Sequence, residues 1–142
     1  MSKKFTFQTR IGFGDCDPAG IVYFPNFYRW MDMATHAMWQ TAGWPAERIE
    51  RELNLWAWPL IECGATFKSP ATYNQIITIH STIGSWANKT FRVDQQVFRT
   101  EDDGTDTFLL EAFEVRFLGA KIPGSFKLKA AIIPEQLKRA FE

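Results

Sequence analysis

The sequence predicts an α+β domain in which one long helix packs on a curled antiparallel sheet. Two observations carry this prediction. A single long stretch with helical periodicity, residues 25–42, follows one strand-like segment, and an unbroken series of strand-like segments then runs from residue 60 to residue 133. The chain has 142 residues, of which 46% are hydrophobic, which is enough for a core of its own. No repeat or linker divides residues 1–142, so we expect a single domain.

The first strand is predicted over residues 4–13, where the side chains alternate strictly in character. The face with the larger side chains carries Phe5, Phe7, Thr9, Ile11 and Phe13. A period of two is typical of a half-buried strand. The segment 14–20, which is rich in turn-forming residues and contains Pro18, is expected to end it.

The helix is predicted over residues 25–42. Pro25 suits a first helical position, where its missing N–H costs nothing, and Gly43 supplies a stop. The apolar stripe with helical spacing consists of Phe27, Trp30, Met31, Ala34 and Met38. Tyr28 and Trp39 widen this stripe beyond one face, so we expect the sheet to surround the helix. A shorter, more charged helix is predicted over residues 45–52.

The remainder of the chain is predicted to form strands. The expected strands are residues 60–67, 75–83, 91–100, 108–118 and 126–133. Residues 102–104, Asp-Asp-Gly, are a strong hairpin signal between the third and fourth of them. Residues 134–141 are expected to form a terminal helix.

Charge and composition narrow the classes of function. The 16 basic and 16 acidic side chains cancel, so we expect neither nucleic acid nor an anionic membrane as a partner. Apolar stretches stay well short of the roughly 20 residues that span a bilayer. The first residues run directly into a strand pattern and do not resemble a signal peptide. Cys16 and Cys63 lie far apart, so a reducing cytoplasm is the expected location.

The most informative segment is residues 13–28, which places Asp15 and Asp17 in a Pro/Gly turn directly before the long helix. The free N–H groups at the start of a helix can bind a developing negative charge on a carbonyl oxygen. A carboxylate beside them can act on the same carbonyl, so the segment predicts a hydrolytic site. Considered alone, Asp17-Pro18 is better explained as the start of a turn.

A known family shares these residues. The sequence FGDCDPAGIVYFPNFY at residues 13–28 resembles the opening motif of the 4-hydroxybenzoyl-CoA thioesterase family, whose members have the hot-dog fold. The sequence IECGATFKSPA at residues 61–71 is similar to the family's second strand and Pro-Ala turn. Residues 86–90 fall where a ligand-facing segment is expected. The resemblance covers nearly the whole chain and implies a long curved antiparallel sheet wrapped around one central helix.

The resemblance assigns the chemistry to the turn. It implies that Asp17 is the catalytic carboxylate, acting either as a nucleophile on the thioester carbonyl or as a general base on water. It also implies that backbone amides near Gly20, Tyr23 and Phe24 polarise that carbonyl. Asp15 is expected to be structural and to bond the amides of the turn.

Further residues are implied to contact the substrate. Asp32 matches a position that contacts the phenol in the 4-hydroxybenzoyl branch, or else it belongs to a polar helix face with Arg29 and His36. Trp58 is expected to help shape the acyl pocket. Lys89 and Arg92 are candidates for the phosphates of coenzyme A, together with Lys127 and Lys129. The resemblance implies arginines at the positions where this chain has Ala87-Asn88.

The resulting prediction is hydrolysis of an aromatic acyl-CoA thioester, with coenzyme A as part of the substrate and no metal or separate cofactor. His36 and His80 show no metal-ligand spacing. The resemblance implies a homodimer with the active site between its subunits, and a homotetramer. Two alternatives remain. Short- or medium-chain thioesterases carry histidine where this chain has Phe24, and non-catalytic acyl-CoA-binding relatives tend to lose the carboxylate that Asp17 retains.

Overall fold

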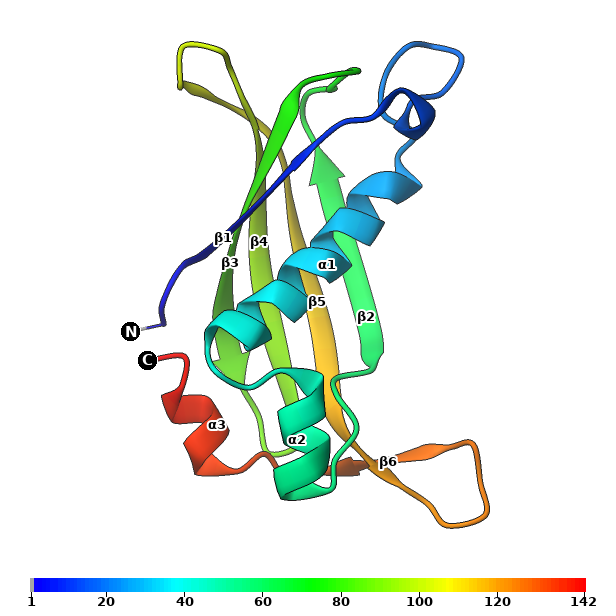
Figure 1. Ribbon diagram of the computed structural model, residues 1–142, viewed down its shortest axis with the longest axis vertical. Coiled ribbons are helices and arrows are strands. Elements are labelled where there is room, and N and C mark those ends of the chain that lie inside the picture. The colour runs from blue at the N-terminus through cyan, green and yellow to red at the C-terminus, as the bar shows by residue number, and fades with distance from the viewer. Residues whose placement is uncertain (1) are drawn as a thin grey trace.

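One long helix, α1 (Pro25–Thr41), lies against one face of a six-stranded antiparallel sheet (Figure 1). The computed structural model describes residues 2–142. Five strands follow the spatial order β1-β3-β4-β5-β2, and β6 pairs with the far end of β5. The strands are β1 (Phe5–Arg10), β2 (Leu60–Phe67), β3 (Ile76–Trp86), β4 (Thr90–Thr100), β5 (Asp106–Lys121) and β6 (Leu128–Ala131). The predicted arrangement of a curved antiparallel sheet around one helix is confirmed.

The central helix follows the prediction from sequence closely. Pro25 occupies its first turn, and Gly43 follows its end with φ of 93°, a left-handed conformation that favours glycine. The side chains that the sheet buries are Phe27, Trp30, Met31, Ala34, Thr35, Met38 and Trp39. These residues recur every three to four positions, so a single stripe of α1 faces the core.

The core is divided into two clusters along α1. The first, here called the upper core, surrounds the first half of α1 and joins Phe27 and Trp30 to Ile77 and Val97. The second, the lower core, surrounds the end of α1 and joins Trp39, Trp58, Phe91 and Phe141 to their neighbours. Trp39 stacks on Trp58 with 4.5 Å between ring centroids. Each half of the helix therefore has a core of its own, and the lower core is the richer in aromatic side chains.

The first strand is shorter than predicted. It ends at Arg10, and residues 13–15 form a single 3-10 turn in which the Gly12 N–H donates to the Asp15 carboxylate at 2.8 Å. Strict alternation stops where this turn begins. Phe13 is consequently 82% exposed, and the prediction that it shares the buried face of the strand is wrong.

The other elements differ from prediction only at their ends. Strand β3 continues past Gly84 to Trp86 because a bulge between Ile83 and Ser85 lets its pairing with β4 resume. Strand β6 occupies only the middle of the predicted segment. The two expected short helices are α2 (Ala46–Leu53) and α3 (Glu135–Arg139). No helix within residues 2–142 has the length and apolar character needed to cross a membrane.

Candidate active site

The segment that leads into α1 is a tight backbone loop that displays Asp17. An isolated bridge between Cys16 and Val22 closes the loop, and the Asp17 N–H donates to the Ile21 carbonyl at 2.9 Å. Gly20 turns the chain with φ of 83°, in the left-handed region. The Ala19 N–H donates to Asp17 Oδ1 at 2.9 Å, and the other carboxylate oxygen has no hydrogen bond within residues 2–142. The loop therefore orients Asp17 and leaves one of its oxygens available.

Asp15 has a different task in the same loop. Its carboxylate accepts hydrogen bonds from the Gly12 N–H at 2.8 Å and from Arg29 Nη2 at 3.2 Å. Its carbonyl accepts bonds from the Asn26 side chain at 2.8 Å and from the Tyr23 N–H at 2.9 Å. These contacts tie the 3-10 turn to the start of α1. The expectation that Asp15 is structural is confirmed.

The amides at the start of the helix are not equally available. The Gly20 N–H donates to the Asp17 carbonyl at 2.9 Å, and the Tyr23 N–H is held by Asp15. The Phe24 N–H has no backbone acceptor within residues 2–142, and Pro25 has no N–H at all. Of the amides of Gly20, Tyr23 and Phe24, which the resemblance implies for the polarisation of a carbonyl, only that of Phe24 is free of other hydrogen bonds within residues 2–142.

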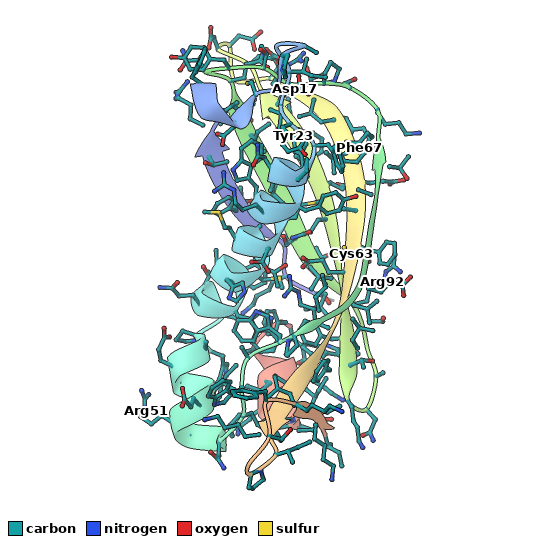
Figure 2. All side chains as sticks on the ribbon, turned by 90° about the vertical axis from the view of Figure 1, so that its right-hand side faces the viewer. Asp17, Tyr23, Arg51, Cys63, Phe67 and Arg92 are labelled. Atoms are coloured by element: carbon teal, nitrogen blue, oxygen red, sulfur yellow. The ribbon has the colours of Figure 1, made fainter. Side chains whose placement is uncertain are left out.

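An apolar hollow lies beside the loop. It has a volume of about 280 Å³ and is lined by Phe24, Phe27 and Phe67 together with residues 69–71. Figure 2 shows Asp17, Tyr23 and Phe67 at the same end of the molecule. The ring of Phe24 packs edge-on against Tyr23, with 5.8 Å between centroids. This end of the protein thus offers a carboxylate, a free amide and an aromatic surface.

A second group of predicted site residues gathers farther along α1. The Asp32 carboxylate accepts a hydrogen bond from Arg116 Nη2 at 2.8 Å, and His36 Nε2 lies 3.6 Å from the same oxygen. The His36 ring packs on Trp58, with 5.2 Å between centroids. Hydrogen bonds and charge from His36 and from Arg116 outweigh desolvation and lower the pKa of Asp32 to about 2. Asp32 is therefore an ionised acceptor at neutral pH.

Arg116 and Glu114 complete this group, and sequence reasoning missed them. Both lie on the face of β5 that is turned toward α1, with 4% and 6% of their side chains exposed. The signal was present in the sequence, because residues 110, 112, 114, 116 and 118 share one strand face and three of them are apolar. A glutamate and an arginine on a face that is otherwise apolar indicate a buried ion pair. We call Asp32, His36, Trp58, Glu114 and Arg116 the acceptor cluster.

A larger cavity opens beside the acceptor cluster. Its volume is about 430 Å³, within the range of small-molecule sites, and His36, Trp58 and Arg116 contribute to its wall. The rest of its lining is mainly apolar and includes Leu55, Trp56 and Leu128. No residue of the loop 13–24 lines this cavity. Within one chain, the structure therefore does not join Asp17 to Asp32 and Trp58 in a single pocket.

Two of the expected phosphate-binding residues, Lys89 and Arg92, line neither the hollow beside the loop nor the cavity beside the acceptor cluster. Lys89 is exposed in the turn between β3 and β4. Arg92 lies on the sheet face turned away from α1, where it pairs with Asp94 at 2.8 Å and stacks over Phe113 at 4.3 Å. Neither residue meets Asp17 in the same chain. Residues 2–142 also contain no group of three or more side chains arranged to hold a metal ion.

One helix enclosed by a curved antiparallel sheet is the architecture of the hot-dog class. Residues 11–141 match the Thioesterase-like superfamily, and the chain belongs to this family. The resemblance found in the sequence is thereby confirmed.

The chain is similar in sequence and in structure to a 4-hydroxybenzoyl-CoA thioesterase. The chain is 39% identical over 119 residues to the 4-hydroxybenzoyl-CoA thioesterase of Pseudomonas sp. (strain CBS-3). This match covers 82% of this chain and 83% of that protein. A solved structure of 4-hydroxybenzoyl CoA thioesterase from the same strain matches with a TM-score of 0.90 at 33% identity, over 98% of this chain and 99% of that one. A 1,4-dihydroxy-2-naphthoyl-CoA hydrolase of Prochlorococcus marinus is 26% identical over 143 residues, covering 95% and 87% of the two chains.

Proposed function

We propose that the protein hydrolyses an aromatic acyl-CoA thioester to the free acid and coenzyme A. The observation that carries the proposal is the pairing, in one loop, of an Asp17 carboxylate oxygen without a partner and an unpaired Phe24 N–H. The similarity to a 4-hydroxybenzoyl-CoA thioesterase supports this choice of substrate class. The similarity to a dihydroxynaphthoyl-CoA hydrolase also favours an acyl group with a hydroxylated ring.

The Asp17 carboxylate and the Phe24 N–H have opposite roles in the proposed reaction. Asp17 supplies electron density, either by attacking the carbonyl carbon or by taking a proton from the water that attacks it. The carbonyl oxygen then becomes negative, and the Phe24 N–H stabilises it as a hydrogen-bond donor. When the tetrahedral intermediate collapses, the C–S bond breaks and coenzyme A leaves as a thiolate. On the first route, water then hydrolyses the mixed anhydride on Asp17. Neither route requires a metal or a separate cofactor.

The complete site is proposed to need a second copy of the chain. Strand β2 is the last strand of the sheet, so one of its edges has unpaired backbone groups. Leu60, Ile61 and Phe67 on this strand are exposed to solvent. Antiparallel pairing of two β2 strands would cover these groups and reverse one chain relative to the other. The Asp17 loop of one copy would then lie toward the acceptor cluster of its partner.

This dimer would assign the remaining predicted residues. Asp17 and Phe24 of one copy would act on the thioester, while Asp32 and Trp58 of the other would hold the acyl ring. Lys89 and Arg92, with Lys127 and Lys129, are proposed to meet the phosphates of coenzyme A near the subunit boundary. Association of two dimers into a homotetramer is part of the proposal. The free thiols of Cys16 and Cys63 suit the proposed cytoplasmic location.

The test is release of free thiol from benzoyl-CoA and 4-hydroxybenzoyl-CoA by the purified protein. Asp17→Asn should lower kcat about 10²- to 10⁴-fold, the usual contribution of a positioned acid or base, while coenzyme A thioesters still bind. Asp102→Asn makes the same chemical change in an exposed hairpin turn and should leave kcat unaltered. Binding without thiol release by the unaltered protein would identify a carrier of acyl-CoA. Unchanged turnover in Asp17→Asn would refute the proposed role of this residue.

A further inference from the structure

The buried ion pair of Glu114 and Arg116 lies beneath α1 and takes no direct part in the reaction proposed above. Taking two charges out of water costs several kcal/mol per ion unless hydrogen bonds compensate. Well-packed apolar side chains in place of a buried ion pair often give a fold of equal or greater stability. A pair on the buried face of β5 therefore calls for a role besides stability.

Arg116 is fixed by four hydrogen bonds to three parts of the fold. Its Nε and Nη2 atoms donate to the two carboxylate oxygens of Glu114 at 3.2 and 2.6 Å. Nη1 donates to the Trp58 carbonyl at 3.0 Å, and Nη2 donates to Asp32 at 2.8 Å. The two-pronged contact with Glu114 holds the plane of the guanidinium. The orientation of Arg116 thus determines where the Asp32 carboxylate and the Trp58 backbone lie.

Glu114 is held in turn from the helix. The Thr35 hydroxyl donates to Glu114 Oε1, and Gln95 Nε2 donates to the Thr35 oxygen at 3.2 Å. Gln95 also donates to the Met31 carbonyl of α1 at 3.0 Å. A chain of buried hydrogen bonds therefore runs from the sheet through α1 to the guanidinium. These bonds restrict the orientations of the side chains in the network, although the buried Oε1 atom of Gln95 has no hydrogen-bond partner within residues 2–142.

The exposed end of this series of hydrogen bonds is the carboxylate of Asp32. This carboxylate is half-exposed, as is His36, whereas Arg116 is buried. The two carboxylates of Glu114 and Asp32 and the one guanidinium of Arg116 together carry one net negative charge. A carboxylate with spare lone pairs accepts a hydrogen bond from a hydroxyl and cannot donate one while ionised. The cluster therefore presents a fixed acceptor next to His36, whose ring packs on the buried Trp58.

We propose that Arg116, locked by Glu114, is a positioning residue that aims the Asp32 carboxylate at a hydroxyl on the acyl ring. Its effect is on specificity, because the bond exists only with hydroxylated substrates. This inference rests on the proposed function and adds to it the residues that set the preference. The low pKa of Asp32 is consistent with it, since a neutral carboxyl would be a weaker acceptor.

The measurement is a ratio of specificity constants. For each protein, kcat/KM with 4-hydroxybenzoyl-CoA is divided by kcat/KM with benzoyl-CoA, which differs only in the hydroxyl. The variants are Arg116→Lys, which keeps the charge but loses the planar fork, and Arg116→Met combined with Glu114→Gln, which removes both buried charges together. Asp32→Asn is measured alone and with each of them. Arg51→Met removes an exposed arginine of α2 and is the matched control.

The ratio should fall about tenfold or more in the Arg116 variants and in Asp32→Asn, the size expected for a hydrogen bond to a charged group. The combined variants should fall no further than Asp32→Asn alone, because Arg116 acts through Asp32. In these variants kcat/KM for benzoyl-CoA should fall less than kcat/KM for 4-hydroxybenzoyl-CoA, whereas general damage to the fold would lower both constants by the same factor.

Three results would overturn the inference. They are an unchanged ratio in a folded Arg116 variant, losses from Arg116 and Asp32 that multiply as independent effects, and an unaltered protein with no preference for the hydroxylated ring. Failure of the unaltered protein to hydrolyse either thioester would instead refute the proposed function. Thermal melting of each variant establishes that it is folded, and Arg116→Lys tests the inference even if the doubly substituted protein does not fold.

Discussion

The Asp17 loop and the acceptor cluster present carboxylates by opposite means. The loop is built from short-range backbone contacts, and Asp17 is oriented by an amide two residues away. The cluster is built from buried side chains, and Asp32 is oriented by an arginine 84 residues away. The Asp17 carboxylate on its loop can approach a reacting carbon, whereas the Asp32 carboxylate is held in one position by a buried arginine. The difference suits one carboxylate to chemistry and the other to recognition.

The largest expected effect is on stability, and it separates the two regions. Glu114→Ala should lower the free energy of unfolding by about 3–5 kcal/mol, because it leaves Arg116 buried without its closest counter-charge. Urea denaturation measures the change. Glu111→Ala makes the same substitution on the exposed face of the same strand and should alter stability by less than about 0.5 kcal/mol. Equal effects at the two positions would mean that the pair contributes little to the fold.

The next effect is on rate and concerns the loop. Phe24→Pro removes the free N–H, and the φ of −54° at this position is compatible with proline. We expect kcat to fall about 10²- to 10³-fold, the usual cost of losing a donor to a developing oxyanion. Phe24→Ala keeps the N–H and removes only the ring. If Phe24→Ala is as slow as Phe24→Pro, the ring and not the amide is what the reaction requires.

These two regions also explain what the sequence could reveal. The helix, the order of the strands along the chain and the structural role of Asp15 follow from periodicity and from contacts within a few residues. The end of β1 was misplaced because a bond between Gly12 and Asp15 diverts the chain while the apolar pattern continues. The contact of Arg116 with Asp32 could not be predicted, since it depends on β5 being placed beneath α1. The sequence also gave no sign that Asp15 occupies the Tyr23 amide.

The smallest effect is a dependence on acid that belongs to the cluster. The pKa of Asp32 is about 2 in the folded protein, below the ordinary value of 3.8. Its contribution to stability is therefore fully present above pH 3.8 and is lost as the pH falls toward 2. The effect is small because the carboxylate is half-exposed and screened by water.

Carbon NMR of the Asp32 carboxyl group measures this titration directly. The midpoint should lie near 2 in the unaltered protein and should rise in Arg116→Lys, where the fixed donor is lost. Acid unfolding of Asp32→Asn supplies the control, since that variant lacks the titrating group. A midpoint at the ordinary value in the unaltered protein would mean that Arg116 and His36 do not hold the ionised form.

The open edge of β2 has a consequence for the life of the chain in a cell. A newly synthesised copy carries unpaired backbone groups and exposed Leu60, Ile61 and Phe67 until the proposed pairing with a second copy forms. Such an edge accepts any extended chain, so the interval before assembly is a period of aggregation risk. The length of that interval falls as the concentration of fresh copies rises. Synthesis of several copies close together, as on a polysome, would therefore favour the proposed pairing over capture by chaperones.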